Sequence, residues 1–424
     1  MMHFRNMVVA TWLVFCLGLS VEATDWPQFR GPDGNGIATG KDFPTTWGSE
    51  ENIKWKVRLP APANSSPIVS GGRVFLTCAD DDGKRRSLYC FDRTDGKQLW
   101  VRTVEFGKVM PKHLTNTYCS STPASDGKRI VVWHSSAGLY CYDLSGKQLW
   151  SRDLGEFEHD YGPGSSPVIY QDRVVLHCGP GEREFLAAID LENGKTLWET
   201  EEPQDQERAG TLALGSWSTP VIAKVGGKDQ VICAMPTRVN GYDLQTGEIL
   251  WWCGGLSGTA AGTSFDVVSS SPLVANDLCF AMADLRGPSI GFKLGGQGDI
   301  TQSNGLWQID KRNPYSVGTG VFLGKYIYRP NSKPGAVECL EAETGKSVWK
   351  NRAAGRDHWG SMVLAGGNLY AINQRGTTVV FKPNPKEFEE VGRNALGEST
   401  NATPAFSDGQ IFIRTDEHLF CIGK

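Results

Sequence analysis

The sequence has no adjacent pair of cysteines and no Cys-x-x-Cys, although it holds 11 cysteines in 424 residues. Zinc sites built on paired cysteines are therefore not indicated. It also lacks a basic run, since 43 Lys and Arg stand against 47 Asp and Glu, for a net charge of −4. That balance gives no reason to expect nucleic acid or an anionic membrane as partner. Heptads, a nucleophile elbow, a phosphate loop and paired carboxylates are missing too.

Long apolar runs are also absent, except near the start of the chain. Residues 7–19 (MVVATWLVFCLGL) form an apolar stretch of 13 residues after Arg5, which is too short to cross a bilayer. Val21 and Ala23 occupy the small-residue positions expected before a signal-peptide cleavage site. The sequence therefore predicts a signal peptide over residues 1–23 and an exported mature chain, periplasmic or extracellular, without a membrane-spanning segment.

What the sequence does contain is a repeat that ends in a small residue, an acidic residue, a glycine turn and Trp. Clear copies are CFDRTDGKQLW (90–100), CYDLSGKQLW (141–150), AIDLENGKTLW (188–198), GYDLQTGEILW (241–251) and CLEAETGKSVW (339–349). A Ser/Thr-Pro step opens most units, and weaker steps fill the gaps. The openings are Ser66, Thr122, Ser166, Thr219, Ser271, Thr319, Ser361 and Thr403. Repeats of about 40–50 residues made of short β runs and turns are typical of radial β architectures.

Each unit reads as four short strands, so the fold class predicted is all-β, an eight-bladed β-propeller of four-stranded blades. The eighth unit, from residue 401, has three strands before the chain ends, and residues 53–57 supply the missing fourth. This pairing closes the ring and hides two sheet edges. We therefore expect an N-terminal extension over residues 24–52 and a propeller over 53–424. Seven blades is the alternative, because units five and seven are degenerate.

The recurring tryptophans are expected on the outermost strands, where an indole covers the seam to the next blade. They are Trp55, Trp100, Trp150, Trp198, Trp251, Trp307 and Trp349.

This repeat resembles the tryptophan-docking motif of the pyrroloquinoline quinone (PQQ) propellers. The opening Asp25-Trp26-Pro27, with Lys54-Trp55 entering the ring, is similar to the way such chains begin. The resemblance covers roughly residues 25–424 and implies the fold. Two functional branches share that fold: quinoprotein alcohol dehydrogenases, and cofactor-free propellers of the outer-membrane β-barrel assembly factor type.

Site residues must separate the two branches. Quinoprotein alcohol dehydrogenases resemble one another in a bond between adjacent cysteines, which this chain does not have. A Ca²⁺ site needs converging oxygen ligands, and no motif places them; Asp266 and Asn276 read as turn residues. We therefore expect no cofactor and no catalytic residues. A PQQ- and Ca²⁺-dependent dehydrogenase oxidising an alcohol or sugar is the alternative, since soluble sugar-oxidising quinoproteins also lack the cysteine feature.

Cysteines and histidines give weaker signals. Most cysteines occupy equivalent positions in different blades, too far apart to bridge, and are expected to be buried free thiols. A pair such as Cys233–Cys279, or a bridge from Cys119, is the alternative. Strand alternation directs several polar residues toward one rim, where solvated loops are expected rather than a metal or acid/base cluster. They are His113, Asn116, Tyr118, His134, His159, Trp217 and His358.

Arginines give the candidate binding face. One follows the second strand in each of units four to eight, namely Arg238, Arg286, Arg329, Arg375 and Arg414. Exposed together, with His113, Asn116 and Tyr118 beside them, they would form a positive arc over the channel that suits an acidic peptide or ligand. The alternative is that they pair with Asp or Glu. The function favoured is a non-enzymatic scaffold that binds a protein, a peptide or a cell-envelope component.

Overall fold

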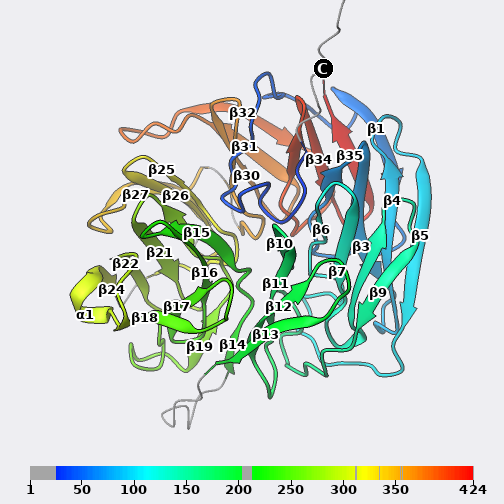
Figure 1. Ribbon diagram of the computed structural model, residues 1–424. Helices are drawn as coiled ribbons and strands as arrows, with labels where there is room; N and C mark the ends of the chain where they lie inside the picture. The colour runs from blue at the N-terminus through cyan, green and yellow to red at the C-terminus, as the bar shows by residue number, and fades with distance from the viewer. Residues whose placement is uncertain are drawn as a thin grey trace, which may run out of the picture.

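Eight β-sheets are arranged radially in a ring (Figure 1). The computed structural model describes residues 25–202, 213–310, 313–333, 335–353, 355 and 357–423, so the predicted signal peptide lies outside the described residues. Each blade is built on four antiparallel strands. The fourth blade carries an additional parallel strand, and the last blade takes one strand from the N-terminal side. Within the described ranges, no helix is long and apolar enough to cross a membrane. The all-β eight-bladed propeller is confirmed, and the seven-blade alternative is wrong.

The first four blades run from the inner to the outer strand in chain order. Blade 1 is β2 (Ile68–Ser70), β3 (Arg73–Ala79), β4 (Arg85–Asp92) and β5 (Gln98–Glu105). Blade 2 is β6 (Ala124–Ser125), β7 (Arg129–Trp133), β8 (Leu139–Asp143) and β9 (Gln148–Arg152), with a 3₁₀ turn at Ser135–Ala137. Blade 3 is β10 (Val168–Tyr170), β11 (Arg173–Cys178), β12 (Phe185–Asp190) and β13 (Thr196–Glu201). Blade 4 is β15 (Val221–Val225), β16 (Lys228–Ala234), β17 (Arg238–Asp243) and β18 (Ile249–Gly254), extended by the parallel β23 (Gly298–Asp299).

The remaining blades complete the ring. Blade 5 is β20 (Leu273–Ala275), β21 (Leu278–Met282), β22 (Ser289–Lys293) and β24 (Gly305–Ile309), with helix α1 (Thr301–Asn304) before its last strand. Blade 6 is β25 (Val321–Leu323), β26 (Tyr326–Asn331), β27 (Ala336–Glu341) and β28 (Ser347–Asn351). Blade 7 is β29 (Val363–Ala365), β30 (Asn368–Ile372), β31 (Thr377–Phe381) and β32 (Glu390–Ala395). Blade 8 is β33 (Ala405–Ser407), β34 (Gln410–Arg414), β35 (His418–Ile422) and β1 (Ile53–Arg58). Outside the blades, β14 (Ala213–Ser216) pairs in parallel with β19 (Phe265–Val268).

The chain closes the ring by pairing its two ends. Strand β1 lies antiparallel to β35, with Trp55 opposite Cys421 and Arg58 opposite His418, and the two strands lie side by side in Figure 1. Arg414 adds a second link across the same seam, because its guanidinium donates to Ser65 Oγ and the Thr77 carbonyl of blade 1 at 2.8 and 2.6 Å. The predicted N-terminal closure is therefore confirmed.

The repeated Trp motif fastens each blade to its neighbour. In six of the seven tryptophans the indole N–H donates to a backbone carbonyl of the next blade, at 2.8–3.1 Å. The pairs are Trp55 to Arg93, Trp100 to Leu144, Trp150 to Leu191, Trp198 to Leu244, Trp307 to Ala342 and Trp349 to Asn384. Trp251 differs, since its N–H donates to Gln230 Oε1 of its own blade. The small residue of the motif stands opposite each Trp, as Cys90 does opposite Trp100, and leaves room for the ring.

Blade 7 has no motif Trp, and the N-terminal extension takes its place. Gly392 stands where the other blades carry Trp, and a Cβ there would lie 2.3 Å from the Thr45 carbonyl oxygen. The side chain of Asn394 accepts from the Trp47 amide at 2.9 Å, and Trp47 stacks on Tyr370 with ring centroids 6.4 Å apart. This explains why unit seven reads as degenerate: its seam is filled from a distant segment of the chain.

The two faces of the ring differ. We call the turn face the side with the hairpins between first and second and between third and fourth strands; there Arg93 of blade 1 donates to the Ser407 carbonyl of blade 8. The loop face carries the hairpins between second and third strands and the connections between blades. On that side the ring of Tyr118, in the connection after β5, packs on Gly83.

The seam contact can be tested by comparing two glycines of blade 1. Gly96 has φ +75° and a Cβ there would lie 2.6 Å from the Trp55 ring, whereas Gly72 has φ +72° and open space around it. The backbone cost of alanine is therefore similar at both. We expect Gly96→Ala to lower the free energy of unfolding by about 1–3 kcal/mol more than Gly72→Ala, as overpacking does. Urea unfolding followed by fluorescence measures this; equal losses would contradict the docking role of Trp55.

Candidate functional site

The Ser and Thr residues that open the repeats form a closed ring of hydrogen bonds around the channel. In each blade the backbone N–H of this residue donates to the side-chain hydroxyl oxygen of its counterpart in the next blade. In order, the donors and acceptors are Ser66 to Thr122 (2.9 Å), Thr122 to Ser166 (3.0 Å), Ser166 to Thr219 (3.2 Å), Thr219 to Ser271 (3.2 Å), Ser271 to Thr319 (3.0 Å), Thr319 to Ser361 (3.1 Å), Ser361 to Thr403 (2.9 Å) and Thr403 to Ser66 (3.0 Å). We call these eight residues the hydroxyl ring. All eight are buried.

The N-terminal segment, residues 25–38, crosses the turn face and closes that end of the channel. Its hydrogen bonds reach blades on opposite sides of the ring. The amide of Trp26 donates to Val69 in blade 1, Gln28 Oε1 accepts from Ile169 in blade 3, and the amide of Ala38 donates to Leu364 in blade 7. Phe29, between these contacts, lines the channel from below. The channel is therefore a cup that opens toward the loop face.

Arg30 holds this floor in place. Its guanidinium is 1% exposed and donates to the Thr319 and Gly320 carbonyls of blade 6 at 3.1 and 2.6 Å. Two further bonds go to the Gly34 and Asn35 carbonyls of its own segment. Burial lowers the pKa of Arg30 to about 9. Carbonyl dipoles thus satisfy a buried cation, and they join the floor to the hydroxyl ring at Thr319.

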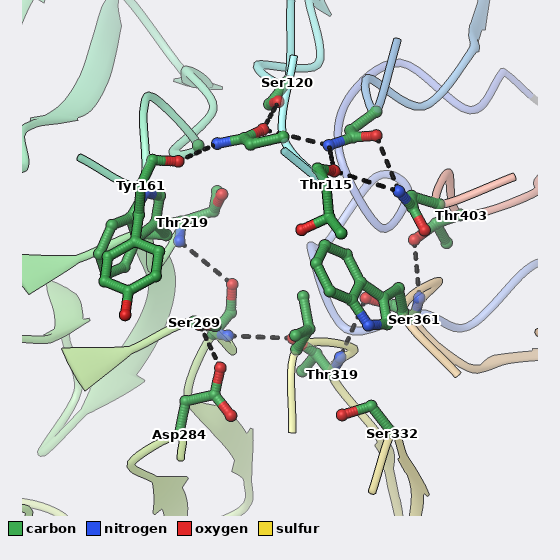
Figure 2. Close-up of a pocket in the computed structure, with 18 of the residues that line it drawn as sticks. Thr115, Ser120, Tyr161, Thr219, Ser269, Asp284, Thr319, Ser332, Ser361 and Thr403 are labelled. Atoms are coloured by element: carbon green, nitrogen blue, oxygen red, sulfur yellow. Dashed lines mark hydrogen bonds between the residues drawn. The ribbon is translucent and has the colours of Figure 1, made fainter. Parts of the chain in front are cut away.

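Above the floor lies a cavity of about 420 Å³, which all eight members of the hydroxyl ring line. Figure 2 shows Thr219, Thr319, Ser361 and Thr403 following one another around it, with Tyr161 on the opposite side from Ser361. The volume falls within the range of about 300–1,000 Å³ that is typical of small-molecule sites.

Side-chain amides build one part of the rim. Asn116 Nδ2 donates to the Tyr161 and Pro163 carbonyls at 2.6 and 2.9 Å, and its Oδ1 accepts from Asn64 Nδ2 at 3.1 Å. Asn64 Oδ1 in turn accepts from Asn401 at 3.1 Å. This chain of amides connects blades 8, 1 and 2, so it fixes the rim rather than leaving mobile loops.

Aromatic side chains form the walls. Trp217 and Trp359 both line the cavity. The Trp217 indole donates to the Gly162 carbonyl at 2.7 Å, and its ring meets Tyr161 edge-on, with centroids 5.9 Å apart. His159 packs against Trp217 at 5.1 Å. The strand pair β14 and β19 positions this wall, since the Trp217 amide donates to Val268 at the end of β19.

Asp284 is the one carboxylate among the described residues that line the cavity. Its Oδ1 accepts from the Leu285 and Ser316 amides at 2.7 and 2.9 Å, and its Oδ2 accepts from Ser269 Oγ at 2.8 Å. Burial raises the pKa of the Asp284 carboxyl above its ordinary value, although these hydrogen bonds oppose the rise.

The predicted arginine arc is not one exposed surface. Arg414 is fully buried at the seam between blades 8 and 1, and Arg329 is 4% exposed and bonded to Glu338 at 2.9–3.0 Å. Arg238 pairs with Glu202 at 3.0 Å and lies over the Trp252 ring. Only Arg286 and Arg375, of the five, are exposed. The alternative of ion pairing thus describes Arg238 and Arg329. Arg329 lies in β26 opposite Glu338 of β27, and Arg238 begins β17 and meets Glu202, which follows β13 of blade 3.

The structure places the three residues predicted beside the arginine arc in different surroundings. His113 and Asn116 line the cavity, whereas Tyr118 is buried below the loop with its hydroxyl bonded to the Met110 carbonyl at 2.7 Å. His134 and His358 are also buried, and burial lowers the pKa of His134 to about 3.

The cysteines that the structure describes are free thiols. All ten in the described part of the chain are buried and unpaired, including Cys119, Cys233 and Cys279, so the disulfide alternatives are wrong. Burial raises the pKa of Cys119 to about 12, which leaves its thiol protonated and unreactive near neutral pH.

The cavity does not fit a quinone held with Ca²⁺. Calcium requires six to eight oxygen ligands, whereas the described lining offers one carboxylate, Asp284, already bonded to three donors. Among the described residues, the one group of His and carboxylates close enough to share a metal is Glu398, Glu417 and His418, which does not line the cavity. We therefore derive no chemistry through such a cofactor.

Sequence reasoning missed Phe29, Tyr161, Trp359 and the inward position of the hydroxyl ring. The Ser/Thr steps themselves were visible, and their constant phase was the signal that could have placed them on one circle. No sequence motif identifies Phe29 or Trp359 as cavity residues, because they come together only when the ring closes.

Comparison with known proteins supports this architecture. The family model described as outer membrane protein assembly factor BamB matches residues 33–117 and 84–351. The outer membrane protein assembly factor BamB of Burkholderia pseudomallei (strain K96243) is 22% identical over 289 residues, which cover 68% of this chain and 67% of that protein. Quinohemoprotein alcohol dehydrogenase ADH-IIG of Pseudomonas putida is 22% identical over 190 residues, 39% of this chain. The match spans a quarter of that enzyme's length, 25%.

Solved structures show the same fold. BamB from Moraxella catarrhalis superposes with a TM-score of 0.57 at 14% identity, covering 87% of this chain and 96% of that one. Quinohemoprotein alcohol dehydrogenase from Comamonas testosteroni gives a TM-score of 0.67 at 12% identity, covering 95% and 81%. At these identities the likeness establishes the propeller and not the activity.

The raised pKa of Asp284 predicts a pH-dependent effect of Asp284→Asn. Below the ordinary carboxyl pKa both folded and unfolded states hold the proton. As the pH rises, the unfolded state loses it first, so wild-type stability falls until the folded-state pKa is passed. Each tenfold difference in acidity is worth about 1.4 kcal/mol. We expect the stability of Asp284→Asn relative to wild type to rise as the pH goes from 4 to 8. A pH-independent difference in melting temperature would contradict this.

Proposed function

The chain belongs to the family described as outer membrane protein assembly factor BamB, and from that premise we propose an exported, non-enzymatic scaffold that binds a polypeptide of the cell envelope. The relative from Burkholderia pseudomallei, which matches over 68% of this chain, carries that same description. Export of this chain rests on the apolar N-terminal stretch. A rigid ring that presents many independent loops is suited to recognition.

The observation that carries the proposal is an exposed segment with apolar side chains on the loop face, residues 109–114, which we call the finger. The connection between β5 and β6 places Leu114 at the surface with 95% exposure and Val109 with 56%. The finger stands beside the cavity, because His113 and Thr115 line it. Exposed apolar surface can mark a protein contact, and Leu114 has the highest exposed fraction of the large hydrophobic residues in the described part of the chain. The loop is anchored below by Tyr118 and Asn116, so the finger is presented and not simply loose.

Charge on this face is mixed. Arg286 and Arg375 are the two exposed arginines of the predicted arc and stay candidate contacts. Near His159, a second hollow is lined by four carboxylates, namely Glu156, Glu158, Asp160 and Glu182. A partner that meets the finger with apolar side chains and brings charges of both signs fits this surface better than a purely acidic one.

The turn face is partly covered by the N-terminal segment, which favours the loop face as the binding side. Residues 25–47 lie over it, and the short hairpins there are tied to one another, as Arg93 is to Asp408 at 3.2 Å.

We expect Leu114→Asp combined with Val109→Asp to abolish capture of the envelope partner while leaving the melting temperature nearly unchanged, because both side chains are exposed. The matched control is Leu306→Asp, a leucine 38% exposed on the outer strand β24. Cross-linking of tagged protein in an envelope fraction measures the loss of one species. If the finger variant retains that species, or the control loses it too, the docking site is misplaced.

The dehydrogenase alternative is tested in the same preparation. PQQ with Ca²⁺ is expected to leave the melting temperature unchanged, because a specific ligand would stabilise the folded state by mass action. Stabilisation together with dye reduction by an alcohol would overturn the scaffold proposal.

A further inference from the structure

The hydroxyl ring leaves eight buried donors unused. A Ser or Thr hydroxyl has one O–H donor and two acceptor positions, and each member of the ring uses one acceptor position for a backbone amide. No described residue accepts a hydrogen bond from any of the eight hydroxyls. Each of these residues is at most 6% exposed, and all line the cavity. Buried donors normally find an acceptor, so these eight O–H groups are available to acceptor oxygens placed in the cavity.

The remaining surfaces specify more about that content. Phe29 covers the floor and the indoles of Trp217 and Trp359 line the walls, so flat apolar faces are available for stacking. At the rim, Ser120 and Tyr161 also line the cavity, and the Ser120 hydroxyl donates to Asn116 Oδ1 (Figure 2). A ring-shaped molecule with hydroxyl groups at its edge and C–H groups on its faces matches both kinds of surface.

The charge of the lining argues for a neutral ligand. Among the described lining residues the charged side chains are Asp284 and Lys333, one of each sign. Asp284 is bonded to three donors, and Lys333 is exposed at the surface. An anion with several carboxylates would find a single ammonium group, and a cation would find a carboxylate whose oxygens are already engaged.

From these observations we infer that the cup binds a neutral, polyhydroxylated ligand of about disaccharide size, a glycan unit. The ligand enters from the loop face, since the floor at residues 25–38 closes the other end. Its oxygens accept from the hydroxyl ring, and its sugar rings stack on Trp217 and Trp359. Leu114 itself does not line the cavity, so the inference can hold whether or not the polypeptide partner docks on the finger.

Calorimetric titration with cellobiose, maltose and N,N′-diacetylchitobiose tests the inference. At least one of the three is expected to bind with Kd below about 1 mM. Trp359→Leu and Trp217→Leu are each expected to weaken that binding by at least about tenfold, while Trp359→Phe keeps an aromatic face and retains it. Trp252→Leu is the control, because Trp252 lies on the outer strand β18 and does not line the cavity.

Three results would overturn the proposal. The first is no heat from any of the three sugars, and the second is binding of galacturonate or PQQ without binding of a neutral sugar. The third is unchanged affinity in both Leu variants. Should those variants unfold, 5-fluorotryptophan labelling of the wild-type protein replaces them: the Trp217 and Trp359 resonances, assigned with the Phe variants, must shift on saturation while Trp252 stays. The site is rejected if the Trp217 and Trp359 resonances do not shift, or if the Trp252 resonance shifts as they do. Loss of partner capture by the finger variant does not bear on this test.

Discussion

The structure depends on one closed circuit of hydrogen bonds, the hydroxyl ring. Each of the eight bonds joins the amide of one blade to the side-chain oxygen of the next, so the circuit closes only when all eight blades are present at the same height and tilt. In most blades a proline follows, and proline has no N–H of its own to satisfy where the chain turns into the inner strand. The ring thereby fixes the channel diameter, and it leaves its O–H groups to the channel.

The other contacts make the two ends of that channel unequal. On the turn face, the docked tryptophans and short hairpins tie neighbouring blades together, and residues 25–47 lie across them. Arg30, buried among carbonyls, joins this cover to blade 6. On the loop face the connections are longer, and the amide network of Asn64, Asn116 and Asn401 holds them apart around the cavity. Both proposals follow from this asymmetry, because the floor closes the channel on the turn face and leaves it accessible from the loop face.

The fold could be read from the sequence because the repeat records it directly. The Trp of each unit and the small residue opposite it are local signals, and the unpaired strand at residues 53–57 pointed to closure. The site was harder, since its residues converge from different blades. Spacing put Arg329 and Arg414 at the same position as Arg375, yet two of these are buried and one is exposed, because burial depends on which neighbour lies across the seam. Phe29 and Trp359 carry no repeat signal at all.

Hydrogen exchange of the intact protein tests the central claim, that the channel is a cup closed on the turn face. The account predicts that the amides of the hydroxyl ring and of Trp26 and Ala38 in the floor exchange as slowly as those of the inner strands, since all donate to residues of the blades. The connection carrying Leu114 should exchange far faster. Fast exchange across residues 25–38 would mean that the floor is not held in place and the channel is open at both ends, which contradicts the account.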